Sequence, residues 1–126
     1  MTDKVDFLLI GGGLASAQAA RSIREAGATG RVMIVTSEPE LPYNRPPLSK
    51  GYLQGKESRE SIFVKPPAFW DEQKVEIVTG RTATTIDRAA HTVTLDDGRI
   101  LGYAKLLYAT GSEPRKPNAP GADLKG

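Results

Sequence analysis

Hydrophobic and polar residues alternate in a way that predicts strands and helices in the first third of the chain. Residues 5–10 form a short apolar run that ends directly in glycines, as expected of a buried parallel strand. Residues 13–26 are rich in alanine and other helix-favouring residues, and Gly27 is placed to end a helix. Residues 31–36 form a second apolar run. Strand, glycine-rich turn, helix and strand together predict a βαβ unit with a right-handed crossover.

The pattern changes after this unit, because prolines and glycines become frequent over residues 37–60. Such a composition predicts an ordered loop, here built around one short helix. Pro46 and Pro47 suit the first turn of that helix, and residues 48–53 would form its body. A further short helix is expected from the proline pair at residues 66–67 to about Gln73.

Residues 75–103 alternate with a period of two, which predicts antiparallel strands. The expected strands are residues 75–78, 83–87, 92–95 and 100–103. Asp96-Asp97-Gly98 is a strong hairpin signal between the last two. A final buried strand is expected at residues 105–109. The whole pattern predicts an α/β domain in which a βαβ unit is followed by an antiparallel β-meander.

Composition and charge exclude several classes of protein. The 17 basic and 15 acidic residues give a net charge of only +2 and are dispersed along the chain, so neither nucleic acid nor membrane is an expected partner. There is no cysteine, which removes disulfides, thiolate metal sites and cysteine redox pairs, and no metal is expected. The first residues lack a signal-peptide core and no apolar run could span a bilayer, so a cytoplasmic location is expected.

The glycines after the first strand carry the main chemical signal. Gly11 and Gly13 match the first two glycines of G-x-G-x-x-G, and Ser16 supplies a small residue at the third position. A diphosphate would bind at the amino end of the following helix, where free N–H groups and the helix dipole favour an anion. Glu38 lies just past the second strand, where an acidic residue binds ribose hydroxyls. The sequence therefore predicts a dinucleotide site, with a ligand-free glycine turn as the alternative.

A proline-rich segment at residues 41–50, L-P-Y-N-R-P-P-L-S-K, restricts the backbone around Arg45 and Lys50. It closely resembles the signature of NADH-dependent ferredoxin and rubredoxin reductases and of the related apoptosis-inducing factor. Residues 109–115, A-T-G-S-E-P-R, resemble the motif at which these enzymes leave the flavin domain. The resemblance covers essentially the whole chain. It implies a Rossmann-like FAD-binding domain at residues 1–111 and, at residues 112–126, a linker toward an NAD(P)H-binding domain that is absent.

The resemblance also implies a specific set of cofactor-binding residues. They are Gly11, Gly12, Gly13, Leu14, Ala15, Ser37, Glu38, Arg45, Lys50, Ala83, Thr110 and Gly111. The first five would cradle the FAD pyrophosphate, with the last two nearby, while residues 37–38 would meet the adenosine ribose and the Ala83 backbone the adenine. Arg45 and Lys50 would approach the phosphates and the isoalloxazine. Lys50 is the expected catalytic residue, because a lysine beside a flavin attracts the negative charge that builds up on reduction.

The leading hypothesis is an FAD-dependent oxidoreductase that takes hydride from NAD(P)H and passes electrons to a ferredoxin or rubredoxin. Its disulfide-reducing cousins need a cysteine pair and are excluded by the absence of cysteine. The resemblance implies an amino-terminal segment that is inactive alone. One alternative is a flavoprotein of the apoptosis-inducing-factor type with a mainly binding role. Another is an NAD(P)-binding dehydrogenase domain, which predicts further βαβ units in place of the antiparallel strands.

Overall fold

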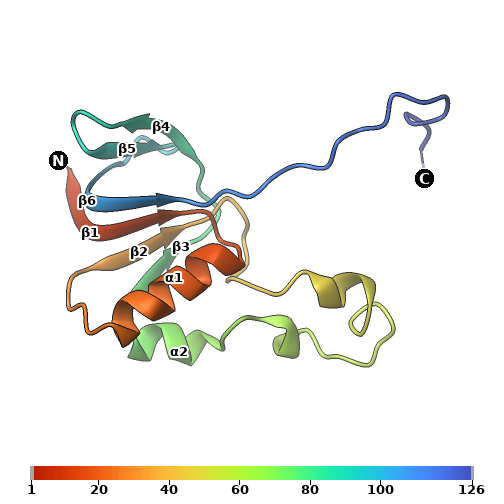
Figure 1. The fold of residues 1–126 in the computed structure, drawn as a ribbon, viewed down its shortest axis with the longest axis horizontal. Helices are drawn as coiled ribbons and strands as arrows, with labels where there is room; N and C mark the ends of the chain where they lie inside the picture. The colour runs from red at the N-terminus through yellow and green to blue at the C-terminus, as the bar shows by residue number, and fades with distance from the viewer. Residues whose placement is uncertain (1, 126) are drawn as a thin grey trace.

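One mixed six-stranded sheet organises the protein, as a computed structural model that describes residues 2–125 shows (Figure 1). The strands lie in the order β3-β2-β1-β6-β5-β4. In chain order the elements are β1 (Asp3–Ile10), α1 (Leu14–Glu25), β2 (Val32–Val35), the 3₁₀ turns η1 (Pro46–Ser49) and η2 (Glu60–Ile62), α2 (Pro67–Glu72), β3 (Val75–Val78), β4 (Ala83–Asp87), β5 (Thr92–Leu95) and β6 (Ile100–Tyr108). The predicted α/β class with a Rossmann-like βαβ unit and an antiparallel part is confirmed.

The parallel half of the sheet is buried on both faces. Alternate residues of β1 and β2 point to opposite sides, so Leu9 and Ile34 face the two helices whereas Leu8 and Met33 face away from them. Ala17 and Ala20 of α1 lie against the helix-side residues and let the helix approach closely. Trp70 of α2 fills the same layer. Because both faces of the sheet are covered here, the apolar residues at the end of β1 and throughout β2 follow one another without alternating with polar ones.

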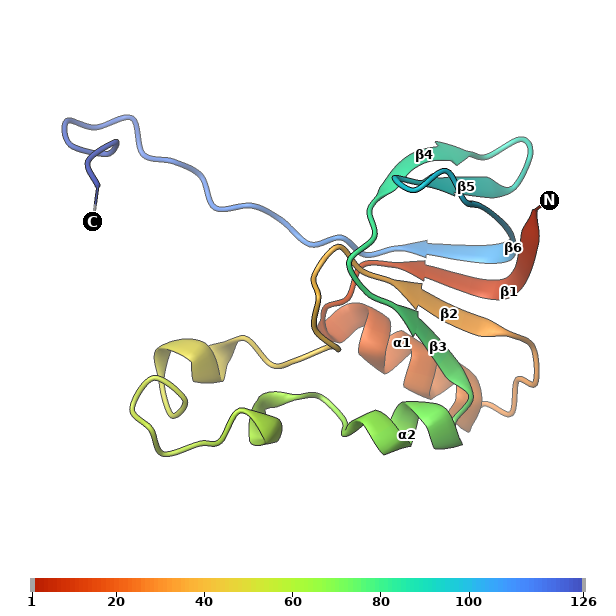
Figure 2. The same cartoon turned by 180° about the vertical axis from the view of Figure 1, so that it is seen from behind.

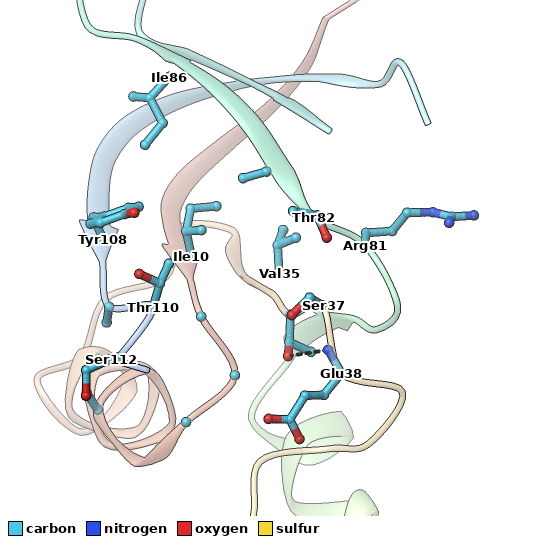
Figure 3. A pocket seen from close by; sticks show the side chains of 18 of the residues that line it. Ile10, Val35, Ser37, Glu38, Arg81, Thr82, Ile86, Tyr108, Thr110 and Ser112 are labelled. Atoms are coloured by element: carbon cyan, nitrogen blue, oxygen red, sulfur yellow. Dashed lines mark hydrogen bonds between the residues drawn. The ribbon is translucent and has the colours of Figure 1, made fainter. Parts of the chain in front are cut away.

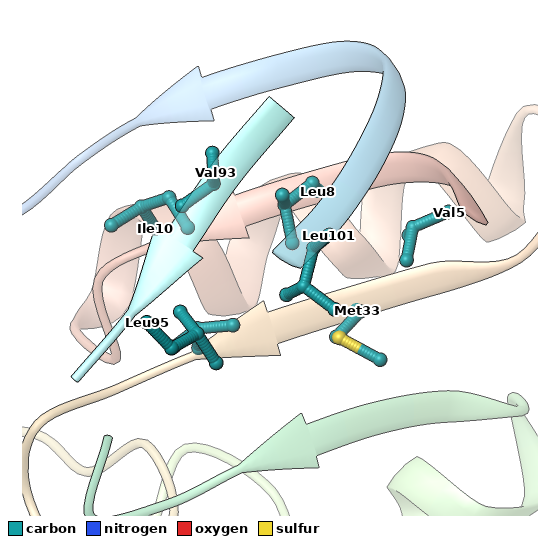
Figure 4. Close-up of a cluster of buried hydrophobic side chains, with 8 residues drawn as sticks. Val5, Leu8, Ile10, Met33, Val93, Leu95 and Leu101 are labelled. Carbon is teal, nitrogen blue, oxygen red and sulfur yellow. The ribbon is translucent and has the colours of Figure 1, made fainter. Parts of the chain in front are cut away.

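The opposite face of the sheet is covered by the antiparallel strands. Leu8 and Ile10 of β1 pack there with Val93 and Leu95 of β5 and with Leu101 of β6 (Figure 4). The hairpin of β4 and β5 thus folds back over the parallel strands (Figure 2). Its position places residues after β3 beside the carboxyl ends of β1 and β2.

The predicted antiparallel strand at residues 75–78 is wrong in direction. β3 pairs in parallel with β2, in the register Val32↔Val75 to Val35↔Val78. The physical reason is the connection, because parallel neighbours need a long crossover and α2 lies on the path from β2 to β3. The parallel part of the sheet therefore includes β3, and among the six strands of the described residues only β4, β5 and the start of β6 form antiparallel pairs.

A single strand replaces the two expected at residues 100–103 and 105–109. β6 runs from Ile100 to Tyr108, pairing with β5 over residues 100–102 and with β1 from Leu101 to Tyr108. Because β1 pairs with β6 on both sides of Ala104, the small residues inside β6 do not end the strand. The same strand thus joins the antiparallel pair to the parallel sheet.

The helix expected over residues 48–53 is also wrong. Only Pro46–Ser49 forms one 3₁₀ turn, and separate turns follow it to residue 55. Gly51 and Gly55 explain this ending, because glycine loses the most conformational freedom in a helix. Gly55 adopts φ +71°, which ends helical geometry. Lys50 therefore lies in a turn and not within a helix.

Residues 112–125 form no strand or helix and are exposed, and they lead away from the sheet in Figure 1 and Figure 2. Their predicted role as a linker stays a prediction. Within residues 2–125, no helix is both long and apolar enough to cross a membrane. Among the same described residues, no three or more histidine, aspartate or glutamate side chains lie close enough together to hold a metal ion.

Arg31 ties the first three strands together at the edge opposite the glycines. Its guanidinium donates to Asp3 at 2.5 Å and to Glu76 at 2.6 Å. The hydrogen bond from Arg31 lowers the pKa of the Asp3 carboxyl. A lowered folded-state pKa means that the pair stabilises the fold above the unfolded pKa of aspartate and loses this effect as the pH falls through the folded value.

We expect Arg31→Met to lower the free energy of unfolding at pH 7 by about 1 kcal/mol or less, because both partners are more than a third exposed. The difference in the free energy of unfolding between the two proteins should shrink at pH 3, because the unfolded chain binds a proton at Asp3 more readily than the folded wild type, whose Asp3 pKa is lowered. Urea unfolding at the two pH values measures it. Arg88→Met is the control, since Arg88 forms no ion pair within residues 2–125. An equal difference in the free energy of unfolding at both pH values would contradict the prediction.

Candidate functional site

A cavity of about 980 Å³ lies where the parallel strands β1, β2 and β6 end (Figure 3). Four segments and Arg45 line it: residues 10–15, 35–38, 81–86 and 108–112. In open α/β sheets, ligands bind outside the carboxyl ends of the strands. The cavity is therefore the candidate site, and its chemistry depends on what each segment presents to it.

Backbone hydrogen bonds bring the three strand ends together. The N–H of Gly11 donates to the Val35 carbonyl at 2.9 Å, and the N–H of Ala109 donates to the Ile10 carbonyl at 2.8 Å. Gly11 has φ +120°, and a Cβ there would overlap the Ala109 carbonyl. A Cβ on Gly12 would likewise overlap the side chain of Thr36. The first two glycines are thus needed for the close approach of the strand ends.

Gly13 differs from its neighbours, because a Cβ added to it would meet no protein atom within 4 Å. Gly13 is the N-cap of α1, and no side chain caps the helix there. The first turn contains no acidic residue, and Leu14 and Ala15 line the cavity. Free N–H groups and the positive end of the helix dipole favour an anion at such a terminus. Residues 11–15 therefore fit the pyrophosphate of a dinucleotide.

The segment after β2 is held by hydrogen bonds on both sides. The N–H of Glu38 donates to Thr36 Oγ1 at 3.2 Å (Figure 3), and the Glu38 carbonyl accepts from the N–H of Gly80 at 2.9 Å. The N–H of Arg81 donates to the Thr36 carbonyl at 3.0 Å. Ser37 is exposed within this segment and lines the cavity with Glu38.

Both carboxylate oxygens of Glu38 are engaged by the proline-rich segment. Tyr43 Oη donates to Oε2 at 2.7 Å, and Arg45 Nη2 donates to Oε1 at 2.9 Å. The hydrogen bond to Glu38 raises the pKa of Tyr43, so its hydroxyl stays a donor at neutral pH. An ionised carboxylate can accept about four hydrogen bonds, so Glu38 keeps capacity for ribose hydroxyls.

The structure brings together eleven of the twelve predicted site residues, because all except Lys50 line the cavity. Lys50 is exposed in the turn after η1, where its N–H donates to the Pro47 carbonyl. Its side chain does not line the cavity formed by the described residues. The catalytic role of Lys50 stays a prediction.

Several lining residues were not among those predicted. They are Ile10, Val35, Thr36, Arg81, Thr82, Thr84, Thr85, Ile86, Tyr108, Ala109 and Ser112. The strand ends could have been found, since each follows directly from the rule that ligands bind at the carboxyl ends of parallel strands. The threonines around Ala83 belong to no sequence motif that would have predicted them. They reach the cavity only because the β4–β5 hairpin folds over the sheet.

The chain belongs to the pyridine nucleotide-disulphide oxidoreductase family, whose sequence profile matches residues 5–126. It is similar to a ferredoxin–NAD(P)+ reductase of Sphingomonas sp., with 37% identity over 127 residues, covering 100% of this chain and 31% of the relative. Putidaredoxin reductase of Pseudomonas putida is 38% identical over 118 residues, covering 93% of this chain and 28% of the relative. The predicted resemblance to ferredoxin reductases is therefore confirmed.

Solved structures agree with these relatives. A chain in the crystal structure of the covalent putidaredoxin reductase–putidaredoxin complex matches with a TM-score of 0.87 and 35% identity, over 95% of this chain and 28% of that one. NADH:rubredoxin oxidoreductase from Clostridium acetobutylicum matches with a TM-score of 0.82 and 28% identity, over 97% and 32%. The chain thus spans about 30% of the length of the proteins it matches. Membership of this family implies FAD and NAD(P)H as redox cofactors.

Proposed function

We propose that this chain holds FAD in an oxidoreductase that accepts hydride from NAD(P)H and passes electrons to a ferredoxin or rubredoxin. One observation carries the proposal: the glycine loop, the open amino end of α1 and the Glu38 carboxylate lie around a single cavity. Two of these groups suit a pyrophosphate and the third suits a ribose, which are adjacent parts of an adenosine diphosphate group. The names of the relatives support the reductase class and the iron–sulfur type of acceptor.

The residues of this chain have distinct roles in the proposal. Backbone N–H groups at residues 11–15 bind the pyrophosphate, and Glu38 binds the ribose. Arg45 is 69% exposed in its side chain and can turn from Glu38 toward a phosphate. Lys50 is proposed to act near the flavin ring as a positive charge. When bound, FAD supplies the step between two-electron hydride chemistry and one-electron transfer.

Ligand preference tests this proposal. The 126-residue chain, titrated with FAD in a calorimeter, should bind one equivalent, and ADP should compete for the same site. FAD should bind more tightly than NAD+, which carries the same adenosine diphosphate group but lacks the flavin. Flavin absorbance that elutes together with the protein in gel filtration provides an independent readout. Binding of NAD+ in preference to FAD would favour the dehydrogenase alternative and contradict the proposal.

A further inference from the structure

Tyr43 contacts the candidate ribose-binding carboxylate from outside the cavity. Its hydroxyl donates to Glu38 Oε2 at 2.7 Å, yet Tyr43 is not among the residues that line the cavity. The side chain of Arg45, which contacts the other carboxylate oxygen, does line the cavity. Tyr43 therefore acts on a ligand only through Glu38.

The backbone around Tyr43 is fixed by a distant part of the chain. Tyr43 forms a β-bridge with Phe63, while the N–H of Asn44 donates to the Ile62 carbonyl at 2.8 Å. The N–H of Val64 donates to the Pro42 carbonyl at 3.0 Å. Pro42 is fully buried and Ile62 is 6% exposed. These contacts hold the tyrosine in place by tertiary packing as well as by the local proline-rich sequence.

The two donors to Glu38 differ in how firmly they are held. Tyr43 is half-buried and anchored on both sides, whereas the Arg45 side chain is 69% exposed. Exposed ion pairs contribute little because water screens them and their side chains keep much of their freedom. The hydrogen bond from Tyr43 is thus the stronger constraint on the direction of the carboxylate.

We propose that Tyr43 is a positioning residue that orients the Glu38 carboxylate toward the ribose 2′-hydroxyl and so sets a preference for ribonucleotides over 2′-deoxyribonucleotides. This inference rests on the proposed function of the cavity. A carboxylate that is already oriented binds a hydroxyl without first losing side-chain freedom, which raises affinity for that hydroxyl alone. Because Tyr43 occupies only Oε2 of Glu38, the other oxygen, Oε1, can release Arg45 and accept a hydrogen bond from the ligand.

Calorimetric titration of the 126-residue chain with ADP and with 2′-deoxy-ADP tests the inference. The wild type should prefer ADP by about tenfold, the effect of one charge-assisted hydrogen bond. In Tyr43→Phe this preference should fall to about threefold or less, through weaker ADP binding, while affinity for 2′-deoxy-ADP stays nearly constant. Glu38→Gln should reduce the preference as well, and the double variant should lose little more, because both act on one contact.

Tyr52→Phe is the matched control, since the Tyr52 hydroxyl makes no hydrogen bond to a side chain or backbone group within residues 2–125. It should keep the wild-type preference, and thermal melting should show that both tyrosine variants are folded. Equal loss of affinity for the two nucleotides in Tyr43→Phe would indicate a general structural role and overturn the inference. An unchanged preference would overturn it too. Failure of the wild type to bind either FAD or ADP would instead overturn the proposed function.

Discussion

Gly13→Ala is expected to weaken FAD binding by about ten- to a hundredfold while the chain stays folded. The backbone of Gly13 is extended, at φ −87°, and alanine adopts this conformation without strain. A methyl group there would meet no protein atom within 4 Å, so it would project into open space beside the amino end of α1. That space is where a pyrophosphate would approach the backbone. Loss of one or two hydrogen bonds to a charged group corresponds to this range of affinity.

Gly11→Ala is the matched comparison, with the same added methyl two residues earlier. Its φ of +120° is closed to alanine, and the new Cβ would overlap the carbonyl of Ala109. A strained backbone of this kind costs about 1–3 kcal/mol before any overlap is relieved. We expect the free energy of unfolding to fall by more than about 2 kcal/mol. Gly13→Ala should lower it by about 1 kcal/mol or less, the effect of a changed N-cap.

Urea unfolding followed by circular dichroism measures the free energy of unfolding, and calorimetric titration measures the affinity for FAD. The two variants should separate cleanly, one losing stability and the other losing affinity. Full FAD affinity in a folded Gly13→Ala variant would show that the cofactor does not approach the backbone at residue 13. An unchanged stability of Gly11→Ala would contradict the close contact between the glycine loop and the end of β6.

Leu8→Ala should lower the free energy of unfolding by about 2–5 kcal/mol. Leu8 is 0% exposed and lies between the parallel sheet and the covering strands β5 and β6 (Figure 4). Its removal leaves a cavity in a layer that joins the two halves of the fold, and the surrounding strands cannot collapse fully into it. A loss of this size is a large part of the stability of an ordinary domain.

Leu53→Ala is the control for Leu8→Ala, because the chemistry is the same but Leu53 is 74% exposed. It should change the free energy of unfolding by about 0.5 kcal/mol or less. Urea unfolding at one pH compares the three proteins. Similar losses in the two variants would mean that the layer between β1 and β5 does not support the fold.

The sequence predicted the βαβ unit well because its elements are defined by local rules. The apolar run of β1 and the alanines of α1 each have a clear period, and Gly27 ends the helix at φ +85° as expected. The glycine loop and Glu38 were found in the same way, since their spacing follows from the geometry of one strand–turn–helix. Most predicted cofactor-binding residues lie in these segments and line the cavity, and their role in binding a cofactor stays a prediction.

The direction of β3 and the ending of the proline-rich segment were not predictable by local rules. Four residues such as 75–78 read alike in a parallel or an antiparallel pair, and only the path through α2 to the edge of β2 decides between them. Residues 48–53 have helix-favouring members, but the two glycines and the contacts of η1 outweigh that preference. Propensity is a weak guide wherever tertiary contacts compete with it.

The sequence by itself determined the class of this protein, through a βαβ unit, a glycine-rich loop at the start of the helix and a family signature at residues 41–50. Only the tertiary structure decided how these parts meet. The carboxyl ends of β1, β2 and β6 converge because β6 serves both halves of the sheet, and the β4–β5 hairpin then supplies one wall of the cavity. Tyr43 reaches Glu38 because residues 62–64 hold its backbone. Such contacts join residues far apart in the chain, and no local period encodes them.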